Sequence, residues 1–200
     1  MIIHNLEQGS EEWLKIRIGK FTASSFHVFL GNSKTKENEL YKKAAERITG
    51  VKCDSDTFSN KHTERGNKLE DEARSIYELL NDVMVDEVGF IELDKNTGYS
   101  PDGLIGEEGL LEIKCKDNHT FLRNKIKGEK GIESQYRTQI QFGLYVTGRK
   151  WCDYVCYNPN FNDSLIFIRI FRDEEKISKI AECLNECNIK IDEIIKGFES

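Results

Sequence analysis

The sequence predicts an α/β protein with a mixed central sheet flanked by helices. Short runs rich in apolar and β-branched residues, typical of strands, occupy segments 83–93, 98–115, 151–157 and 165–171. Helices are expected over segments 37–49, 61–80 and 133–146 and from residue 173 onward. Two hundred residues with 38% hydrophobic content suit one globular domain with a sizeable core, so we expect a single domain over 1–200.

Local signals place the elements at the amino-terminal end. After an extended stretch over 1–6, Ser10 is a good N-cap for a helix over 11–19. A second helix is expected over 22–30, and it stops at Gly31. Trp13 and Ile16 are expected on the buried side of the first helix.

The segment 98–115, GYSPDGLIGEEGLLEIKC, concentrates the charged residues of interest. Its GEEG stretch is turn-prone, which predicts a strand, a turn and a second strand. Because side chains alternate along a strand, Glu112 and Lys114 point one way while Leu111 and Ile113 point into a core. If Asp102 ends the first strand beside them, three charged groups converge.

Two carboxylates and a lysine suit phosphodiester hydrolysis. Carboxylate oxygens of Asp102 and Glu112 are hard ligands for Mg²⁺, which lowers the pKa of a bound water. Lys114 can orient that water or steady the charge that builds on the phosphate. The alternative is that Glu112 and Lys114 form a solvated pair on an amphipathic strand and that Asp102 is a turn residue.

Four blocks of the sequence, in this order, resemble the lambda-exonuclease family, also described as YqaJ-like viral recombinase nucleases, within the PD-(D/E)xK superfamily. They are EEWLKIRIGKFTASSF (11–26), RGNKLEDEAR (65–74), SPDGLIGEEGLLEIKC (100–115) and QYRTQIQFGLYVTGRKWCDYVCYNP (135–159). The resemblance covers roughly residues 8–160 and implies a restriction-endonuclease-like nuclease core. Many members have proline after the ExKC segment, whereas Lys116 follows Cys115 here.

The resemblance also implies an activity. The expected enzyme is a Mg²⁺-dependent 5′-to-3′ exonuclease that degrades one strand of double-stranded DNA from its ends in phage or prophage homologous recombination. It implies a single-strand annealing protein as partner and a ring-shaped homotrimer. The expected metal ligands are Asp102, Glu112, Glu70 and the backbone carbonyl of Ile113, holding one or two Mg²⁺ ions, with Mn²⁺ as a substitute.

Further residues take roles by the same resemblance. Lys114 positions the nucleophile, and a glutamine of the 133–146 helix assists it. The lambda-type pattern favours Gln139, and the QxxxY pattern of RecB-type nucleases favours Gln141. One helix face cannot supply both, and Gln139 is the first candidate. Arg65 is expected to support the site. Without the resemblance, Glu70 would be interpreted as an ordinary solvated glutamate on a helix.

A phosphate pocket is the last implied feature. Arg17 and Ser24 match family positions that grip the 5′-terminal phosphate, and Ser100 beside Asp102 is assigned with them. A guanidinium and hydroxyl groups suit a doubly charged phosphate. The alternative for Arg17 is a surface ion pair with Glu11 or Glu12.

Composition limits the remaining choices. The net charge of −6 argues against a protein that coats DNA with its whole surface but not against a local groove. Basic residues gather between Lys114 and Lys130 and acidic ones over 173–200, as a DNA-facing surface requires, although the basic segment alone favours an ordinary mobile loop. No apolar run is long enough to span a bilayer, so a cytoplasmic protein without a membrane partner is expected, in the host bacterial cytoplasm if phage-encoded. The six cysteines are expected to be reduced, and their i,i+4 pairs suggest core packing rather than zinc.

Two rival functions stay open at this level. An endonuclease or nickase could use the same core, because the catalytic trio does not distinguish an end from an internal bond. A catalytically vestigial DNA-binding subunit is the alternative outside the enzymes, and the intact D…ExK set speaks against it.

Overall fold

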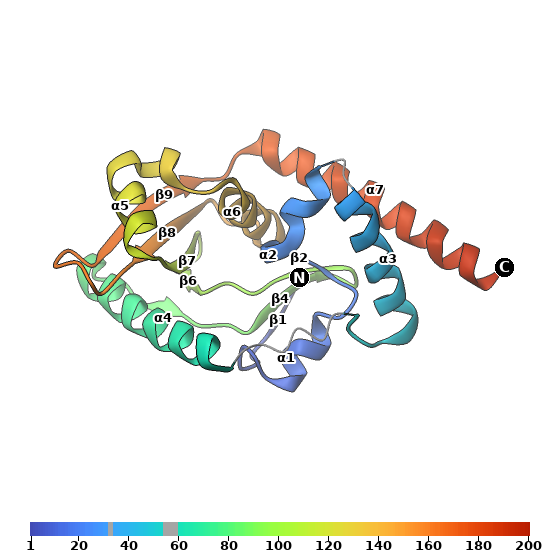
Figure 1. Ribbon diagram of the computed structural model, residues 1–200, viewed down its shortest axis with the longest axis horizontal. Helices are drawn as coiled ribbons and strands as arrows, with labels where there is room; N and C mark the ends of the chain where they lie inside the picture. The colour runs from blue at the N-terminus through green and yellow to red at the C-terminus, as the bar shows by residue number, and fades with distance from the viewer. Residues whose placement is uncertain (32–33, 54–59) are drawn as a thin grey trace.

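Two mixed β-sheets form the centre of the computed structural model, which describes residues 1–31, 34–53 and 60–200, with the side chains of 60–67 left out (Figure 1). The first sheet has the order β1 (Ile2–His4), β4 (Phe90–Asp94), β5 (Thr97–Tyr99), β2 (Phe21–Thr22). The second has the order β3 (Val85–Asp86), β6 (Gly103–Ile105), β7 (Gly109–Cys115), β8 (Trp151–Tyr157), β9 (Leu165–Phe171). The pairs β2–β5 and β7–β8 are parallel, and the other described pairs are antiparallel.

Helices surround these sheets. In chain order they are α1 (Glu11–Ile16), α2 (Ala23–Phe26), η1 (His27–Leu30), α3 (Lys34–Thr49), α4 (Asn60–Asn81), α5 (Asn118–Lys127), η2 (Gly128–Gly131), α6 (Ser134–Thr147) and α7 (Glu174–Glu199). Helix α4 packs against β7, β8 and β9, and α6 packs against β4, β5, β7 and β8. The mixed α/β class predicted from the sequence is confirmed, with the strands divided between two sheets.

Strand alternation in β7 decides which helix each side chain meets. Leu111 and Ile113 join a core cluster with Ala73 and Tyr77 of α4. Leu110 instead belongs to the larger cluster, which contains the buried residues of α6. Glu112 and Lys114 share the face of Leu110, so they point toward α6.

Three expected elements differ from the structure. Segment 83–93 forms two short strands, β3 and β4, which belong to different sheets, and 22–30 divides into α2 and the 3₁₀ helix η1. Segment 116–130, expected as a loop, contains helix α5. Asp117 caps this helix by accepting a hydrogen bond from the Thr120 N–H, and Phe121 is fully buried, so an apolar anchor and a cap outweigh the lysine content.

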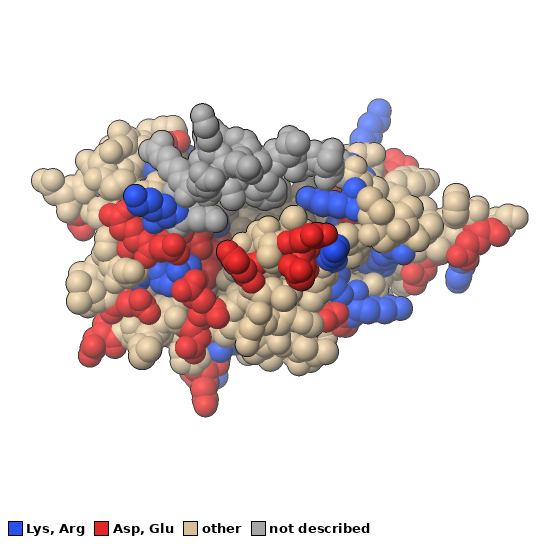
Figure 2. Space-filling model, turned by 90° about the horizontal axis from the view of Figure 1, so that it is seen from below, with Lys and Arg blue, Asp and Glu red and all other residues tan. Residues whose placement is uncertain are grey.

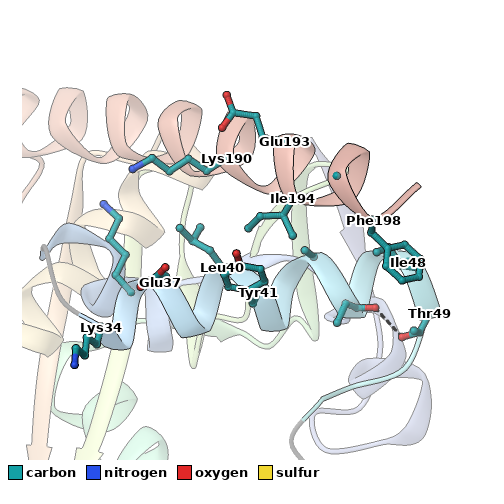
Figure 3. A pocket seen from close by; sticks show the side chains of 14 residues that line it. Lys34, Glu37, Leu40, Tyr41, Ile48, Thr49, Lys190, Glu193, Ile194 and Phe198 are labelled. Carbon is teal, nitrogen blue, oxygen red and sulfur yellow. Dashed lines mark hydrogen bonds between the residues drawn. The ribbon is translucent and has the colours of Figure 1, made fainter. Parts of the chain in front are cut away.

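The carboxyl-terminal helix α7 reaches beyond the body of the protein (Figure 1). It packs against α3, α6 and η1, and between α3 and the far half of α7 lies an apolar groove with Tyr41, Ile194 and Phe198 among its lining residues (Figure 3). Cys183 and Cys187 of α7 are buried, as are Cys152 and Cys156 of β8, so these four thiols pack in the core. Within the described residues, no helix combines the length and apolarity needed to cross a bilayer.

Candidate active site

Asp102 lies in the connection between β5 and β6, one residue before β6, rather than at the end of a strand. Its Oδ2 accepts a hydrogen bond of 2.7 Å from the backbone N–H of Ile113. The β6–β7 pairing begins at Gly103 and Leu111, so Asp102 takes the place of a strand partner on that edge of β7. The N–H and C=O of one strand residue point to the same edge, so the carbonyl of Ile113 also opens toward Asp102.

Glu112 is completely buried and accepts hydrogen bonds from three side chains. Nζ of Lys114 lies 2.5 Å from Oε1, and Nε2 of Gln139 donates to the same oxygen over 2.5 Å. The Tyr99 hydroxyl donates to Oε2 over 3.2 Å. Burial raises the pKa of Glu112 to about 7, aided by the charge of Asp102 and opposed by Lys114.

Lys114 joins the two carboxylates. Its Nζ lies 3.9 Å from Oδ2 of Asp102 as well as beside Glu112. Burial pushes the pKa of Lys114 down, but Glu112 and Asp102 raise it well above the ordinary value for lysine. The ammonium group therefore keeps its charge at neutral pH, as a group that stabilises a developing phosphate charge must.

Glu70 of α4 lies at the edge of this cluster. Burial raises its pKa to about 8, and the charges of Asp102 and Glu112 add to the effect while Arg74 and Lys114 oppose it. Arg74 donates to Glu70 over 3.3 Å and to the backbone carbonyl of Asp102 over 3.3 Å. The buried guanidinium of Arg74 therefore links the helix that carries Glu70 to the chain that carries Asp102.

The structure separates the two candidate glutamines of α6. Gln139 reaches Glu112, whereas Gln141 is buried elsewhere, donating to the Phe171 carbonyl over 2.9 Å and accepting from the Asp173 N–H over 3.0 Å. Gln141 thus ties α6 to the junction between β9 and α7. Arg65 lies in the part of α4 whose side chains are not described.

The expected phosphate pocket is only partly assembled. Nη1 of Arg17 donates to the Ser100 hydroxyl over 2.9 Å, and its guanidinium lies 4.0 Å from the centre of the Trp13 ring. The Trp13 indole N–H donates to the same hydroxyl over 2.9 Å, so the hydroxyl hydrogen of Ser100 is left for an oxygen ligand. Ser24 is exposed on α2 and hydrogen-bonds to neither partner.

The alternative pairing of Arg17 is absent from the described structure, because Glu11 pairs with Lys15 instead. Burial lowers the pKa of Arg17 to about 10, which still leaves the guanidinium protonated at neutral pH. The charged guanidinium of Arg17 and the hydroxyl group of Ser100 can both donate hydrogen bonds to a phosphate, and the Trp13 ring holds the guanidinium in place.

The donor set fits a hard divalent cation. No group of three His, Cys, Asp or Glu side chains lies closely enough together in the described residues to form a ready-made cage. Mg²⁺ does not require one, because it commonly keeps several waters and takes one or two carboxylates with substrate phosphates. Asp102, Glu112 and the Ile113 carbonyl provide hard oxygen atoms. Burial raises the pKa values of Glu112 and Glu70, the charge of Asp102 adds to this effect, and a bound cation would favour the ionised form of both carboxyl groups.

A cavity of about 710 Å³ opens beside the site. It is lined by residues of the β1–α1 connection, of α1, of α4, and of the β3–β4 and β5–β6 connections, among them Trp13, Glu70, Arg74 and Asp102. Acidic side chains gather on the face of the molecule that carries α1 and α4 (Figure 2). A DNA backbone approaching this face therefore needs bound cations or the local basic groups to offset the repulsion.

Three supporting residues were not predicted from the sequence: Tyr99, Arg74 and Trp13. Tyr99 is 13 positions from Glu112 and in the other sheet, so no local spacing connects them. Its ring fits because residue 143 is glycine, where a Cβ atom would lie 2.8 Å from the ring. Arg74 stands in the quoted RGNKLEDEAR block and Trp13 in EEWLKIR, so both lay in recognised segments without an assigned role.

Comparisons with known proteins show which family and which solved structures the chain is similar to. A family model described as the YqaJ-like viral recombinase domain matches residues 12–150. The crystal structure of the alkaline exonuclease LHK-Exo from Laribacter hongkongensis is 30% identical, with a TM-score of 0.79 over 95% of this chain and 98% of that one. The crystal structure of LHK-Exo in complex with dAMP is 31% identical to this chain, with a TM-score of 0.80 over 95% of this chain and 98% of that one.

Two further proteins are similar to this chain at lower sequence identity. A phage-related exonuclease from Haemophilus somnus 129PT shares the fold, with 19% identity and a TM-score of 0.68 over 90% of this chain and 96% of that one. Protein R354 of Acanthamoeba polyphaga mimivirus is 28% identical over an alignment of 168 residues that covers 76% of this chain. The chain spans 29% of the length of that viral protein.

Proposed function

The chain belongs to the YqaJ-like viral recombinase family, and on this premise we propose that it is a Mg²⁺-dependent 5′-to-3′ exonuclease that degrades one strand of double-stranded DNA from its ends. The observation that carries the proposal is the convergence of Asp102, Glu112 and Lys114, with Gln139 on the same oxygen of Glu112 as Lys114. The likeness to an alkaline exonuclease crystallised with dAMP, a deoxynucleoside monophosphate, supports the same class of product.

The residues divide the chemistry between them. Asp102, Glu112 and the Ile113 carbonyl, with Glu70 nearby, would hold the cation. When bound, Mg²⁺ would stabilise the charge that develops on the phosphate and lower the pKa of the attacking water. Lys114 adds a fixed positive charge at the phosphate. Gln139 holds the Glu112 carboxylate in place and is available to orient the water.

End recognition follows from Arg17 and Ser100. A terminal phosphate carries a second negative charge that an internal phosphodiester lacks, and Arg17 can bind it through parallel N–H donors. The Ser100 hydroxyl supplies another donor, and Ser24 on α2 would complete the pocket when DNA is bound. Holding the terminal phosphate fixes the distance from the strand end to the first scissile bond.

The biological setting is part of the proposal. We place the enzyme in phage or prophage homologous recombination, in the cytoplasm of the host, as a homotrimer that works with a single-strand annealing protein. The family match supports this setting.

The decisive experiment compares linear, nicked and closed circular duplexes in Mg²⁺, Ca²⁺ and EDTA. The proposal expects cleavage of the linear duplex in Mg²⁺, DNA binding without efficient cleavage in Ca²⁺, and neither cleavage in EDTA nor cutting of the closed circle. Cutting of closed circles would instead identify an endonuclease. Tight DNA binding without any cleavage in Mg²⁺ would identify a vestigial binding subunit.

A further inference from the structure

A second charged cluster lies next to Lys114 on the same side of β7. Lys116 continues the alternation of Glu112 and Lys114, and its N–H still pairs with the Tyr157 carbonyl of β8. Its Nζ lies 3.4 Å from Oε1 of Glu133, the residue that precedes α6. Nη2 of Arg123, from α5, donates to the same oxygen over 2.8 Å. Three separate elements thus meet at one carboxylate beside the proposed catalytic lysine.

Tyr136 connects this cluster to the catalytic centre. Nζ of Lys116 lies 3.9 Å from the centre of the Tyr136 ring, and Nζ of Lys114 lies 5.4 Å from the same point. Tyr136 and Gln139 are three residues apart on α6, so they share a helix face. One face of α6 therefore supports both Glu112 and the two lysines.

The cluster carries an excess of positive charge. Lys116 and Arg123 share a single carboxylate, which leaves one net positive charge in the group. The Arg123 side chain is 38% exposed although its Nε is buried, while the Lys116 side chain is only 11% exposed and is held in place. Positive groups fixed beside a nuclease centre attract a DNA backbone more strongly than mobile surface lysines do.

Several polar atoms here have no hydrogen-bond partner among the described residues. They are Nε of Arg123, Oε2 of Glu133 and the hydroxyl of Tyr154. Tyr154 is fully buried and lies opposite Glu112 in the β7–β8 register. Because buried polar groups are nearly always paired, a group of unpaired ones indicates a site that is completed by water or by a ligand.

We propose that Lys116 and Arg123 bind the phosphate that follows the scissile phosphate on its 3′ side, on the strand being degraded. This inference rests on the proposed function. Helix α1, which precedes Arg17, and helix α5, which carries Arg123, lie on opposite sides of the β6–β7 hairpin (Figure 1). A strand whose terminal phosphate is held at Arg17 and whose next linkage lies at Asp102 and Glu112 then continues toward Lys116. Glu133 holds the two cations together at this end of β7.

The test is a cycle that combines protein variants with one uncharged DNA linkage. The substrate is a 5′-phosphorylated duplex with a methylphosphonate immediately 3′ of the first scissile linkage, and the reference duplex has it several linkages further along. Release of the first nucleotide is measured as kcat/KM for wild type, Lys116→Gln, Arg123→Gln and Lys116→Arg. The matched control is Lys125→Gln, which removes a lysine of the same helix α5 that pairs with Asp163.

For wild type, we expect the neighbouring methylphosphonate to lower kcat/KM about tenfold, the size of one lost charged hydrogen bond. Lys116→Gln and Arg123→Gln should show a similar loss on the natural duplex and a clearly smaller further loss on the modified one than wild type shows, because only one of the two cationic partners remains. Lys116→Arg should recover most of the loss, which a folding defect would not allow. In Lys125→Gln, the methylphosphonate should lower kcat/KM by the same factor as in wild type, so that the effects of the substitution and of the modified linkage multiply.

Two results would contradict this inference, and they can be distinguished from each other. In the first contrary result, wild type cleaves both duplexes equally, or the methylphosphonate lowers kcat/KM by the same factor in Lys116→Gln and Arg123→Gln as in wild type. These residues then do not bind that phosphate, although the nuclease function stands. If wild type cleaves no linear duplex in Mg²⁺, the proposed function itself is wrong and the inference falls with it.

Discussion

The side-chain amide of Gln139 donates a 2.5 Å hydrogen bond to the Glu112 oxygen that also lies 2.5 Å from Nζ of Lys114. This relationship joins α6 to β7 at the centre of the site. Glu112 thereby has a fixed orientation, with its second oxygen held by Tyr99. Each partner of Glu112 can be removed separately, so its contribution can be measured.

Removal of the acidic ligands or of Lys114 should nearly abolish cleavage. Asp102→Asn, Glu112→Gln and Lys114→Ala each take away a charge that acts on the transition state, so we expect kcat to fall by about a hundredfold or more. Initial rates on a linear duplex in Mg²⁺ measure the effect, and circular dichroism checks the fold. Full activity in Glu112→Gln would rule out the proposed mechanism.

The two glutamines of α6 should differ in what their loss changes. Gln139→Ala should lower kcat while leaving the unfolding temperature close to that of wild type. Gln141→Ala removes two interior hydrogen bonds, to Phe171 and Asp173, and should lower the free energy of unfolding by about 1–3 kcal/mol. Thermal unfolding and single-turnover rates separate the effects, and the reverse pattern would make Gln141 the catalytic partner.

End selectivity should depend on Arg17. We expect wild type to prefer 5′-phosphorylated over 5′-hydroxyl ends, and Arg17→Ala to lower that ratio by about tenfold or more while slow metal-dependent cleavage persists. Ser100→Ala should act in the same direction. The measurement is the ratio of initial rates on the two kinds of end. An unchanged ratio in Arg17→Ala would remove this residue from the pocket.

The Tyr99 hydroxyl should act through Glu112. Tyr99→Phe keeps the packing of the ring but removes the donor to Oε2, so kcat should fall with little change in KM for DNA. Gly143→Ala should produce a larger defect, because its Cβ atom would lie 2.8 Å from the Tyr99 ring and force the ring to move. If Tyr99→Phe has wild-type kcat, the hydroxyl has no positioning role.

The raised pKa of Glu70 predicts how stability depends on pH. A carboxyl group whose folded pKa is about 8, against an ordinary value of 4.5, stabilises the metal-free fold at low pH, and this contribution is lost as pH rises through 8. The unfolding temperature of Glu70→Gln, relative to wild type in EDTA, should therefore increase between about pH 5 and pH 8. Mg²⁺ should reduce this difference, because it favours the ionised carboxylate.

A control and a contrary result define this last test. Glu11→Gln removes an exposed acid that pairs with Lys15 on α1, and its difference from wild type should lack the rise toward pH 8. If the unfolding temperature of Glu70→Gln relative to wild type stays constant or falls with pH, the pKa of the Glu70 carboxyl is not raised in the folded protein.

Local sequence was sufficient for the features that depend on the regular repeat of a strand or helix. Side-chain alternation placed Glu112 and Lys114 on one face, with Leu111 and Ile113 on the other, and the structure has that arrangement. Ser10 was predicted as the cap of α1, and it accepts from the Trp13 N–H. These outcomes depend on neighbours within a few residues, which a sequence displays directly.

Only the tertiary structure decided which distant groups meet. Gln139 was preferred over Gln141 by resemblance alone, and the docking of α6 turns Gln139 toward Glu112 and Gln141 toward the β9–α7 junction. Arg17 reaches Ser100 across 83 positions, and Tyr99 reaches Glu112 from the other sheet. Residue identity and spacing therefore predicted a candidate site, whereas the partners of each group depended on packing between elements, which no local pattern encodes.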